Sequence, residues 1–253
     1  MIVLETIIVA FSMFSAIPMP KIEWTANNMR FSLLAFPLIG IVIALCEWSW
    51  DQLCILLMLP ALLRGAGLCL IPAVMTGGIH LDGYADTSDA LASHSGAERR
   101  QEILKDPHLG AFAAIRLCIY FVADFALWSS VEELRLPVLL GLFCLSRTLS
   151  GLSLTLFPLR EGSGLARSFA DAADKRAVRT ILLITAVGLS LGLVLLKAWE
   201  LPLAAGLLFL HYRIVCERDF AGLSGDLAGW FLQKAEFWML VTLVMRQMIG
   251  TML

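Results

Sequence analysis

The run FSLLAFPLIGIVIALCEWSW, from Phe31 to Trp50, contains a single charged side chain, that of Glu47. As a helix it would cover about 30 Å, the thickness of the hydrocarbon core of a bilayer. Across the whole chain of 253 residues, 59% are hydrophobic and 16% are charged, whereas a soluble domain has about 45–50% apolar and about 25% charged residues. We therefore predict an integral membrane protein.

Six more apolar segments have roughly the length of a membrane span. They cover residues 53–75, 109–130, 137–157, 180–197, 201–216 and 236–252. The alternating ten-residue segments of a membrane barrel are absent. We predict an all-α, polytopic integral membrane helical bundle with about six to seven transmembrane helices, forming a single domain over residues 1–253.

The first twenty residues are apolar but do not resemble a signal peptide, because Glu5 stands where a basic residue is usual. We expect an N-terminal interfacial helix that is ended by Pro18 and Pro20. The six cysteines occur singly in apolar runs. That pattern indicates neither a zinc site nor a disulfide framework.

Basic residues gather in alternate polar segments. These segments are 21–30, 76–108, 159–179 and 217–235, whereas the intervening turns hold little more than Arg135 and Lys197. The positive-inside rule then places the four long segments in the cytoplasm. We predict a multi-pass protein of the inner membrane whose functional site faces the cytoplasm.

The segment GGIHLDGYADTSDAL, residues 77–91, carries three aspartates at i, i+4 and i+7. On a helix, Asp82, Asp86 and Asp89 fall within roughly 60° of one face. Three ionised carboxylates at such spacing repel one another, and a divalent cation removes that repulsion. Because Mg²⁺ prefers oxygen ligands of this kind, the pattern predicts a magnesium site.

Glycines interrupt the same segment. Gly77, Gly78 and Gly83 permit tight turns or a close approach of a ligand to the backbone. Helix packing through small residues is the alternative. His80 lies among these residues, and we take the whole segment to be functional.

Three other polar segments contain candidate residues. Asp106, in LKDPHLGAF, either extends the metal site or caps the following helix. The loop that begins with Arg160 and Glu161 combines glycines with basic residues, a composition that suits phosphate. In SGD, Gly225 and Asp226 form a second small-residue and aspartate element at the same membrane face.

Charged side chains inside membrane spans are costly and usually functional. Arg64, Arg116, Asp124 and Arg147 fall in such positions. Asp124 is a candidate to neutralise one of the arginines. We connect Arg147 to an anionic ligand.

Together these motifs resemble the cobalamin synthase family, the adenosylcobinamide-GDP ribazoletransferases. The pattern GG-x-H-LDG-x-AD-x-x-DA carries most of the specificity, and the resemblance extends over most of the chain. Supporting matches are FPLIG at 36–40, KDPHLGAF at 105–112, Ser146-Arg147, REGSG at 160–164 and SGD at 224–226. The chain departs from the family pattern at Asp124 and Gln233.

The resemblance implies a Mg²⁺-dependent transfer that joins adenosylcobinamide-GDP to α-ribazole or its 5′-phosphate and releases GMP. The ribazole 3′-hydroxyl would attack the phosphorus attached to cobinamide. Asp82, Asp86 and Asp89 would hold one or two Mg²⁺ ions, and His80 or a free aspartate oxygen would accept the proton. The implied substrate contacts are Gly77, Gly78, Gly83, Asp106, Arg147, Arg160, Glu161, Gly225 and Asp226.

Two other functions fit the aspartates less well. A CDP-alcohol-type phosphotransferase acting on a lipid carries a DG-x₂-AR core, but here Asp86 follows Ala85. A divalent-cation carrier would be expected to place its acids near the middle of the membrane rather than at one end. We expect contact with membrane lipid, a possible homo-oligomer and no nucleic-acid partner.

Overall fold

A computed structural model describes residues 2–160, 162 and 164–252. Within these residues the chain forms twelve helices and no strand beyond one isolated bridge between Leu159 and Leu223, so the all-α prediction is confirmed. The helices are α1 (Ile2–Phe14), α2 (Ala26–Met29), α3 (Ser32–Leu56), α4 (Ala61–Thr76), α5 (Ile79–Ala92), α6 (Ala97–Ile103), α7 (Ala111–Ser130), α8 (Leu136–Leu156), α9 (Gly164–Ala172), α10 (Lys175–Leu195), α11 (Glu200–Phe220) and α12 (Gly225–Met252).

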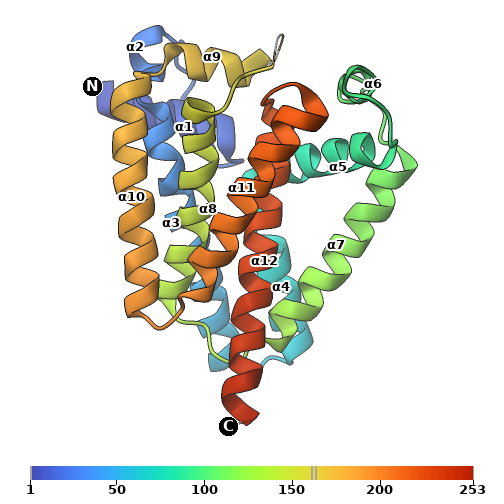
Figure 1. The fold of residues 1–253 in the computed structure, drawn as a ribbon. Helices are drawn as coiled ribbons and strands as arrows, with labels where there is room; N and C mark the ends of the chain where they lie inside the picture. Colours follow the sequence, from blue (N-terminus) through green and yellow to red (C-terminus); the bar gives the residue numbers. More distant parts are fainter. Residues whose placement is uncertain (1, 161, 163, 253) are drawn as a thin grey trace.

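The long helices run side by side, with α7 inclined away from α12 (Figure 1). By length and composition, four helices of the described chain can cross a membrane, namely α3, α7, α8 and α10, and the bent pair α4–α5 would make a fifth. Helices α11 and α12 lie alongside them but do not meet the same test of composition. The prediction of a multi-pass bundle is confirmed, while this stricter count is lower than six to seven.

The boundary predicted between the first two spans is wrong. Helix α3 continues past Trp50 to Leu56, and α4 starts after Pro60. Asp51, which follows the predicted span, is buried and accepts a 2.5 Å hydrogen bond from Arg64 Nε of α4. A partner on the neighbouring helix therefore keeps this carboxylate inside the bundle.

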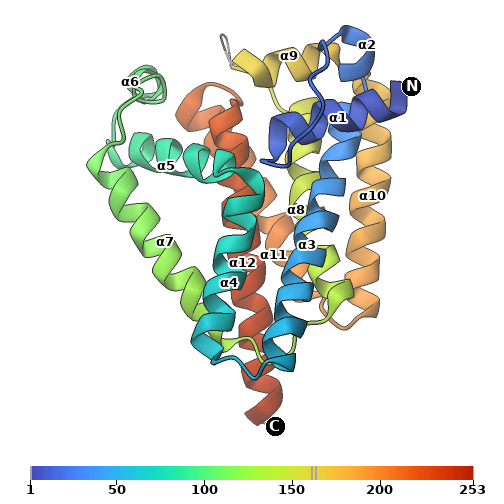
Figure 2. The same cartoon turned by 180° about the vertical axis from the view of Figure 1, so that it is seen from behind.

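Helix α1 lies across one end of the bundle (Figure 2). At 13 residues it is too short to cross a bilayer. It packs on α3, where the rings of Phe14 and Phe36 have centroids 4.4 Å apart. The structure agrees with a helix that lies along the interface, although the helix ends at Phe14, before the prolines expected to stop it.

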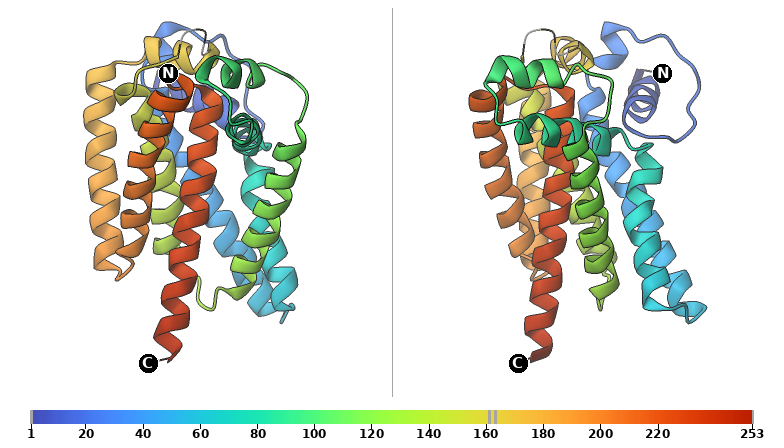
Figure 3. Two further views of the ribbon diagram at one scale, coloured as in Figure 1. Left: turned by 45° about the vertical axis from the view of Figure 1, so that its right-hand side comes forward. Right: turned by 90° about the vertical axis from the view of Figure 1, so that its right-hand side faces the viewer.

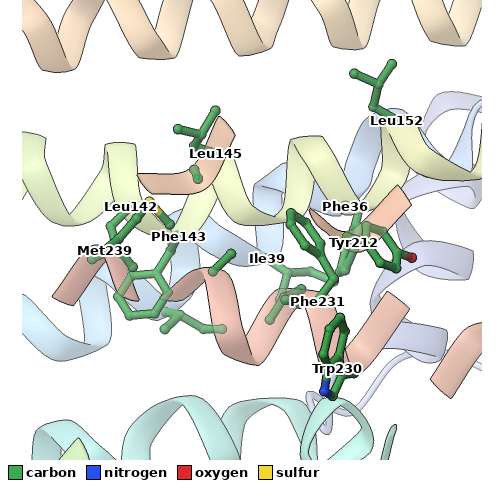
Figure 4. Close-up of a cluster of buried hydrophobic side chains, with 14 of the residues drawn as sticks. Phe36, Ile39, Leu142, Phe143, Leu145, Leu152, Tyr212, Trp230, Phe231 and Met239 are labelled. Carbon is green, nitrogen blue, oxygen red and sulfur yellow. The ribbon is translucent and has the colours of Figure 1, made fainter. Parts of the chain in front are cut away.

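The core is built around α8, which is buried over nearly its whole length. Its backbone approaches α3 so closely that a Cβ on Gly40 would lie 2.5 Å from the carbonyl oxygen of Phe143. On the other side, Tyr212 of α11 stacks on Phe231 of α12 with centroids 4.6 Å apart (Figure 4). Such close packing makes a rigid frame for the polar end of the bundle.

Asp124 does not take the partner expected from the sequence. It forms no ion pair among the described residues, so its predicted pairing with an arginine is not found. Arg64 instead pairs with Asp51, and Arg147 pairs with Glu236 of α12 at 2.5 Å. These pairs join helices that are distant in sequence, and a local pattern does not specify them.

The four segments rich in Lys and Arg meet at the same end of the molecule. Helices α2, α5, α6 and α9 lie together there, above the parallel helices (Figure 3). The short turns 57–60, 131–135 and 196–199 lie at the opposite end (Figures 1 and 2). The grouping expected from the charge count is therefore present in the fold.

Candidate functional site

The aspartate segment forms α5, which lies across the end of the bundle. Gly77 and Gly78 adopt φ angles of +63° and +77°, a left-handed conformation that glycine adopts without steric cost. They bend the chain by 94° between α4 and α5. The predicted tight turn is confirmed, and α4 is the part of this pair that enters the bundle while α5 stays outside the spanning segments.

Two glycines bring α5 into backbone contact with α12. A Cβ on Gly83 would lie 2.6 Å from the carbonyl oxygen of Asp226. A Cβ on Gly229 would lie 3.0 Å from the carbonyl oxygen of His80. Gly83 therefore serves helix packing, the alternative considered from the sequence, and this crossing places Asp82 beside the first turn of α12.

A cavity of about 380 Å³ opens beside this crossing, between α5, α12, α9 and the loop that follows α8. Its polar lining residues are His80, Asp82, Ser150, Arg160, Ser224 and Asp226. Three aromatic rings, those of Phe14, Phe36 and Phe169, form an apolar wall. Predicted residues from three separate segments thus meet in one concave site.

Arg160 is positioned as an anion-binding group. Its backbone N–H donates to Leu223 O at 3.0 Å, and Gly222, at φ +134°, leaves room for this contact. Arg160 is 6% exposed, and its Nε and Nη1 atoms have no hydrogen-bond partner among the described residues. Because buried guanidinium donors are costly to leave unpaired, a phosphate in the cavity would satisfy them.

The carboxylates of α5 share an electrostatic environment with that of α12. Burial, together with the charges of Asp82, Asp226 and Asp89, raises the pKa of Asp86 to about 6. The four carboxylates are therefore close enough to interact electrostatically. Among the described residues, however, no group of three His, Cys, Asp or Glu side chains stands in a ready-made metal-binding arrangement.

Asp89 has a partner outside the aspartate row. Its Oδ1 accepts a hydrogen bond from the backbone N–H of Ala113, in the first turn of α7, at 3.1 Å. The carboxylate also lies against Gly110, the residue that precedes α7. Asp89 thus caps α7 from a neighbouring helix.

Asp106 does not cap α7, so that alternative is wrong. Its Oδ1 accepts from the backbone N–H of His108 at 3.0 Å and lies 2.7 Å from His108 Nδ1. These contacts lower its pKa. The side chain is exposed and lies outside the cavity lining, so a substrate contact for Asp106 stays a prediction.

Arg147 is not part of the cavity lining, so its contact with an anionic ligand stays a prediction. It is fully buried, and its Nη1 donates to Glu236 Oε1 at 2.5 Å and to Phe143 O at 3.0 Å. His80, by contrast, lines the cavity. Burial, together with the charge of Arg147, lowers the pKa of His80 to about 3, so this imidazole is neutral and a weak base.

The remaining predicted residues do not all reach the cavity, since Gly77 and Gly78 are absent from its lining. Gly225 lines the cavity as the first residue of α12, and Ser224 caps that helix by accepting the N–H of Leu227 at 3.4 Å. Glu161 lies outside the described residues. Sequence reasoning missed Phe169, for which the only signal was an apolar residue within a polar segment.

The position of Asp89 gives a prediction that separates capping from metal binding. Asp89→Asn keeps an oxygen that can accept the Ala113 N–H, so we expect it to retain most activity and stability. Asp89→Ala should lower the free energy of unfolding by about 1 kcal/mol, as for the loss of a helix cap. Thermal unfolding and activity assays in detergent check both; a total loss of activity in Asp89→Asn would instead favour metal ligation.

Comparison with known proteins shows which family this chain resembles. The profile of one family, described as cobalamin-5-phosphate synthase, matches residues 6–244. The chain is 42% identical over 238 residues to the adenosylcobinamide-GDP ribazoletransferase of Lachnoclostridium phytofermentans, covering 92% of this chain and 90% of that protein. It is 30% identical to a protein of the same name from Clostridium perfringens strain SM101, covering 92% and 94% of the two chains. No solved structure matches.

Proposed function

Because the chain belongs to the cobalamin-5-phosphate synthase family, we propose that it acts as an adenosylcobinamide-GDP ribazoletransferase. It joins adenosylcobinamide-GDP to α-ribazole or α-ribazole 5′-phosphate and releases GMP. The ribazole 3′-hydroxyl attacks the phosphorus attached to cobinamide, and the bond from that phosphorus to the oxygen bridging to GMP breaks. The product is adenosylcobalamin or its 5′-phosphate.

The convergence of Asp82, Asp226 and Arg160 on one cavity carries the proposal. Phosphoryl transfer depends mainly on positioning and on neutralising charge. The buried Arg160 supplies unpaired donors for phosphate oxygens. The aromatic wall of Phe14, Phe36 and Phe169 gives an apolar surface on which a flat substrate group can lie.

The carboxylates fit Mg²⁺ by the chemistry of their donor atoms. Asp82 and Asp86 of α5, with Asp226 of α12, would hold the ion, whereas Asp89 accepts the N–H of Ala113 in α7. When bound, Mg²⁺ would neutralise charge on the pyrophosphate. Adding Mg²⁺ should raise the unfolding temperature of the wild type but not of Asp82→Asn, a test independent of turnover.

An aspartate oxygen, rather than His80, accepts the proton of the attacking hydroxyl. Of the two acceptors implied by the family resemblance, the imidazole is the weaker candidate, because burial and the charge of Arg147 lower its pKa to about 3. The carboxylates of Asp82 and Asp226 line the same cavity. His80 then serves to pack the α5–α12 crossing against Phe36, whose ring centroid lies 5.7 Å away.

Arg160→Gln is expected to weaken substrate binding. The amide keeps some polarity but loses the positive charge, so KM for the GDP-linked substrate should rise roughly tenfold or more. Arg99→Gln is the matched control, since Arg99 is exposed and pairs with the equally exposed Glu102. Steady-state kinetics measure both; equal KM values for the two variants would contradict the phosphate contact.

The substrate pair is the direct test of the proposed reaction. Purified protein is given adenosylcobinamide-GDP with α-ribazole, or a CDP-activated lipid with an alcohol acceptor. We expect product only from the first pair. Product only from the lipid pair would favour a CDP-alcohol phosphotransferase, and Mg²⁺ uptake into liposomes without turnover would favour a carrier.

The end of the bundle that carries α5 faces the cytoplasm of the inner membrane in this proposal. The clustering of Lys and Arg at that end supports the orientation. A cysteine introduced at the exposed Lys105 should react with an impermeant reagent only in inverted membrane vesicles. Membrane lipid surrounds the bundle, and homo-oligomers are tested by crosslinking in the native membrane.

A further inference from the structure

A second cavity lies between α5, α7 and α12, the three helices seen together in Figure 1. Its volume is about 650 Å³, larger than that of the cavity lined by Asp82 and Asp226. Aromatic side chains form much of its wall: Tyr84, Phe112, Tyr120, Trp230, Phe237 and Trp238. Neither Asp82 nor Asp226 belongs to this lining, so it is a separate site.

Two cations line this cavity without an acidic partner. Arg116 of α7 and Lys234 of α12 form no ion pair among the described residues, and no carboxylate is part of the lining. The ammonium of Lys234 lies 4.5 Å from the centroid of the Trp230 indole. Two unneutralised positive charges in an apolar setting favour an anionic ligand.

The mouth of the cavity faces the lipid-exposed flank of the bundle. Phe112 and Ile119 of α7 and Trp238 of α12 are each about half exposed. Only 17% of the apolar stretch of α7 is buried within the described structure. Arg116 lies about 7.5 Å along α7 from its first residue, near the end of the bundle that carries α5 (Figure 1).

We propose that this cavity binds one anionic phospholipid. Its phosphate lies between Arg116 and Lys234, and its apolar part lies against Phe112 and Trp238. The lateral opening favours a ligand that arrives from the bilayer over a nucleotide from solution. Basic residues near a membrane surface attract anionic lipids, and apolar surroundings strengthen that attraction.

Native mass spectrometry of the full chain in detergent tests the proposal. After delipidation, the protein is titrated with phosphatidylglycerol or with phosphatidylcholine of the same acyl chains. The wild type should prefer phosphatidylglycerol, and Arg116→Gln with Lys234→Gln should reduce that preference roughly tenfold or more. Lys21→Gln with Lys105→Gln removes two exposed charges at the same end and should leave the preference unchanged.

The conservative double variant Arg116→Lys with Lys234→Arg keeps both charges and should retain the preference, which guards against a folding defect in the neutral variant. An equal preference in the wild type and the Gln double variant would overturn the proposal. So would binding of a nucleoside monophosphate, competing with the lipid and lost in the same variant, because that result would assign the cavity to a soluble ligand.

Discussion

Asp82→Asn is expected to reduce turnover by on the order of 10³-fold, because the side chain keeps its shape but loses its charge. Asp82 is the one carboxylate of α5 that lines the cavity with Asp226 and Arg160. Asp86→Asn should have an effect of similar size, since the charges of Asp82 and Asp226 act on the Asp86 carboxylate. The measurement is the initial rate of product formation by protein reconstituted in liposomes.

Lys175→Ala is the control for this experiment. Lys175 is exposed and pairs with Asp171 at 3.6 Å. It begins α10 and is not part of the cavity lining. It should keep nearly full activity. All variants should insert into the membrane and show the same helical circular dichroism. Full turnover in Asp82→Asn would remove this residue from the reaction.

Much of the site could be predicted because its signals are local. The spacing of Asp82 and Asp86 is helical, and Gly77-Gly78 marks a turn that the structure contains. The distribution of Lys and Arg in the sequence predicts that Arg160 and Asp226 lie at the same end of the molecule. The cavity brings Arg160 and Asp226 together with Asp82 in one site, as expected from the family resemblance.

The remaining features depend on contacts between distant segments. Asp89 resembles Asp82 in the sequence, yet it accepts a hydrogen bond from Ala113 on another helix. Arg147 pairs with Glu236, although its position in a span suggested a ligand contact. Asp51 lies inside α3 rather than between two spans, because its partner Arg64 lies on the next helix. A periodic pattern identifies a helix face but not the residue opposite it.

Gly83→Ala is expected to reduce activity at least about 100-fold, because a displacement of about 1 Å at a reacting centre has an effect of that size. The added Cβ would lie 2.6 Å from Asp226 O and 2.9 Å from Asp226 Cα. Both atoms belong to the backbone, so rotation of a side chain cannot relieve the contact. Helix α5 must move away from α12, which separates Asp82 from Asp226. The unfolding temperature should also fall, since overpacking costs about 1–3 kcal/mol.

Gly206→Ala in α11 is the matched control, because a Cβ there meets nothing within 4 Å. Alanine favours a helix over glycine by about 1 kcal/mol, so this variant should be as stable as the wild type or more stable, with unchanged turnover. The two substitutions add the same methyl group to a helical glycine and differ only in what it contacts. Wild-type activity in Gly83→Ala would mean that the α5–α12 crossing does not set the geometry of the reaction, whereas loss confined to Gly83→Ala would connect helix packing directly to the position of the carboxylates.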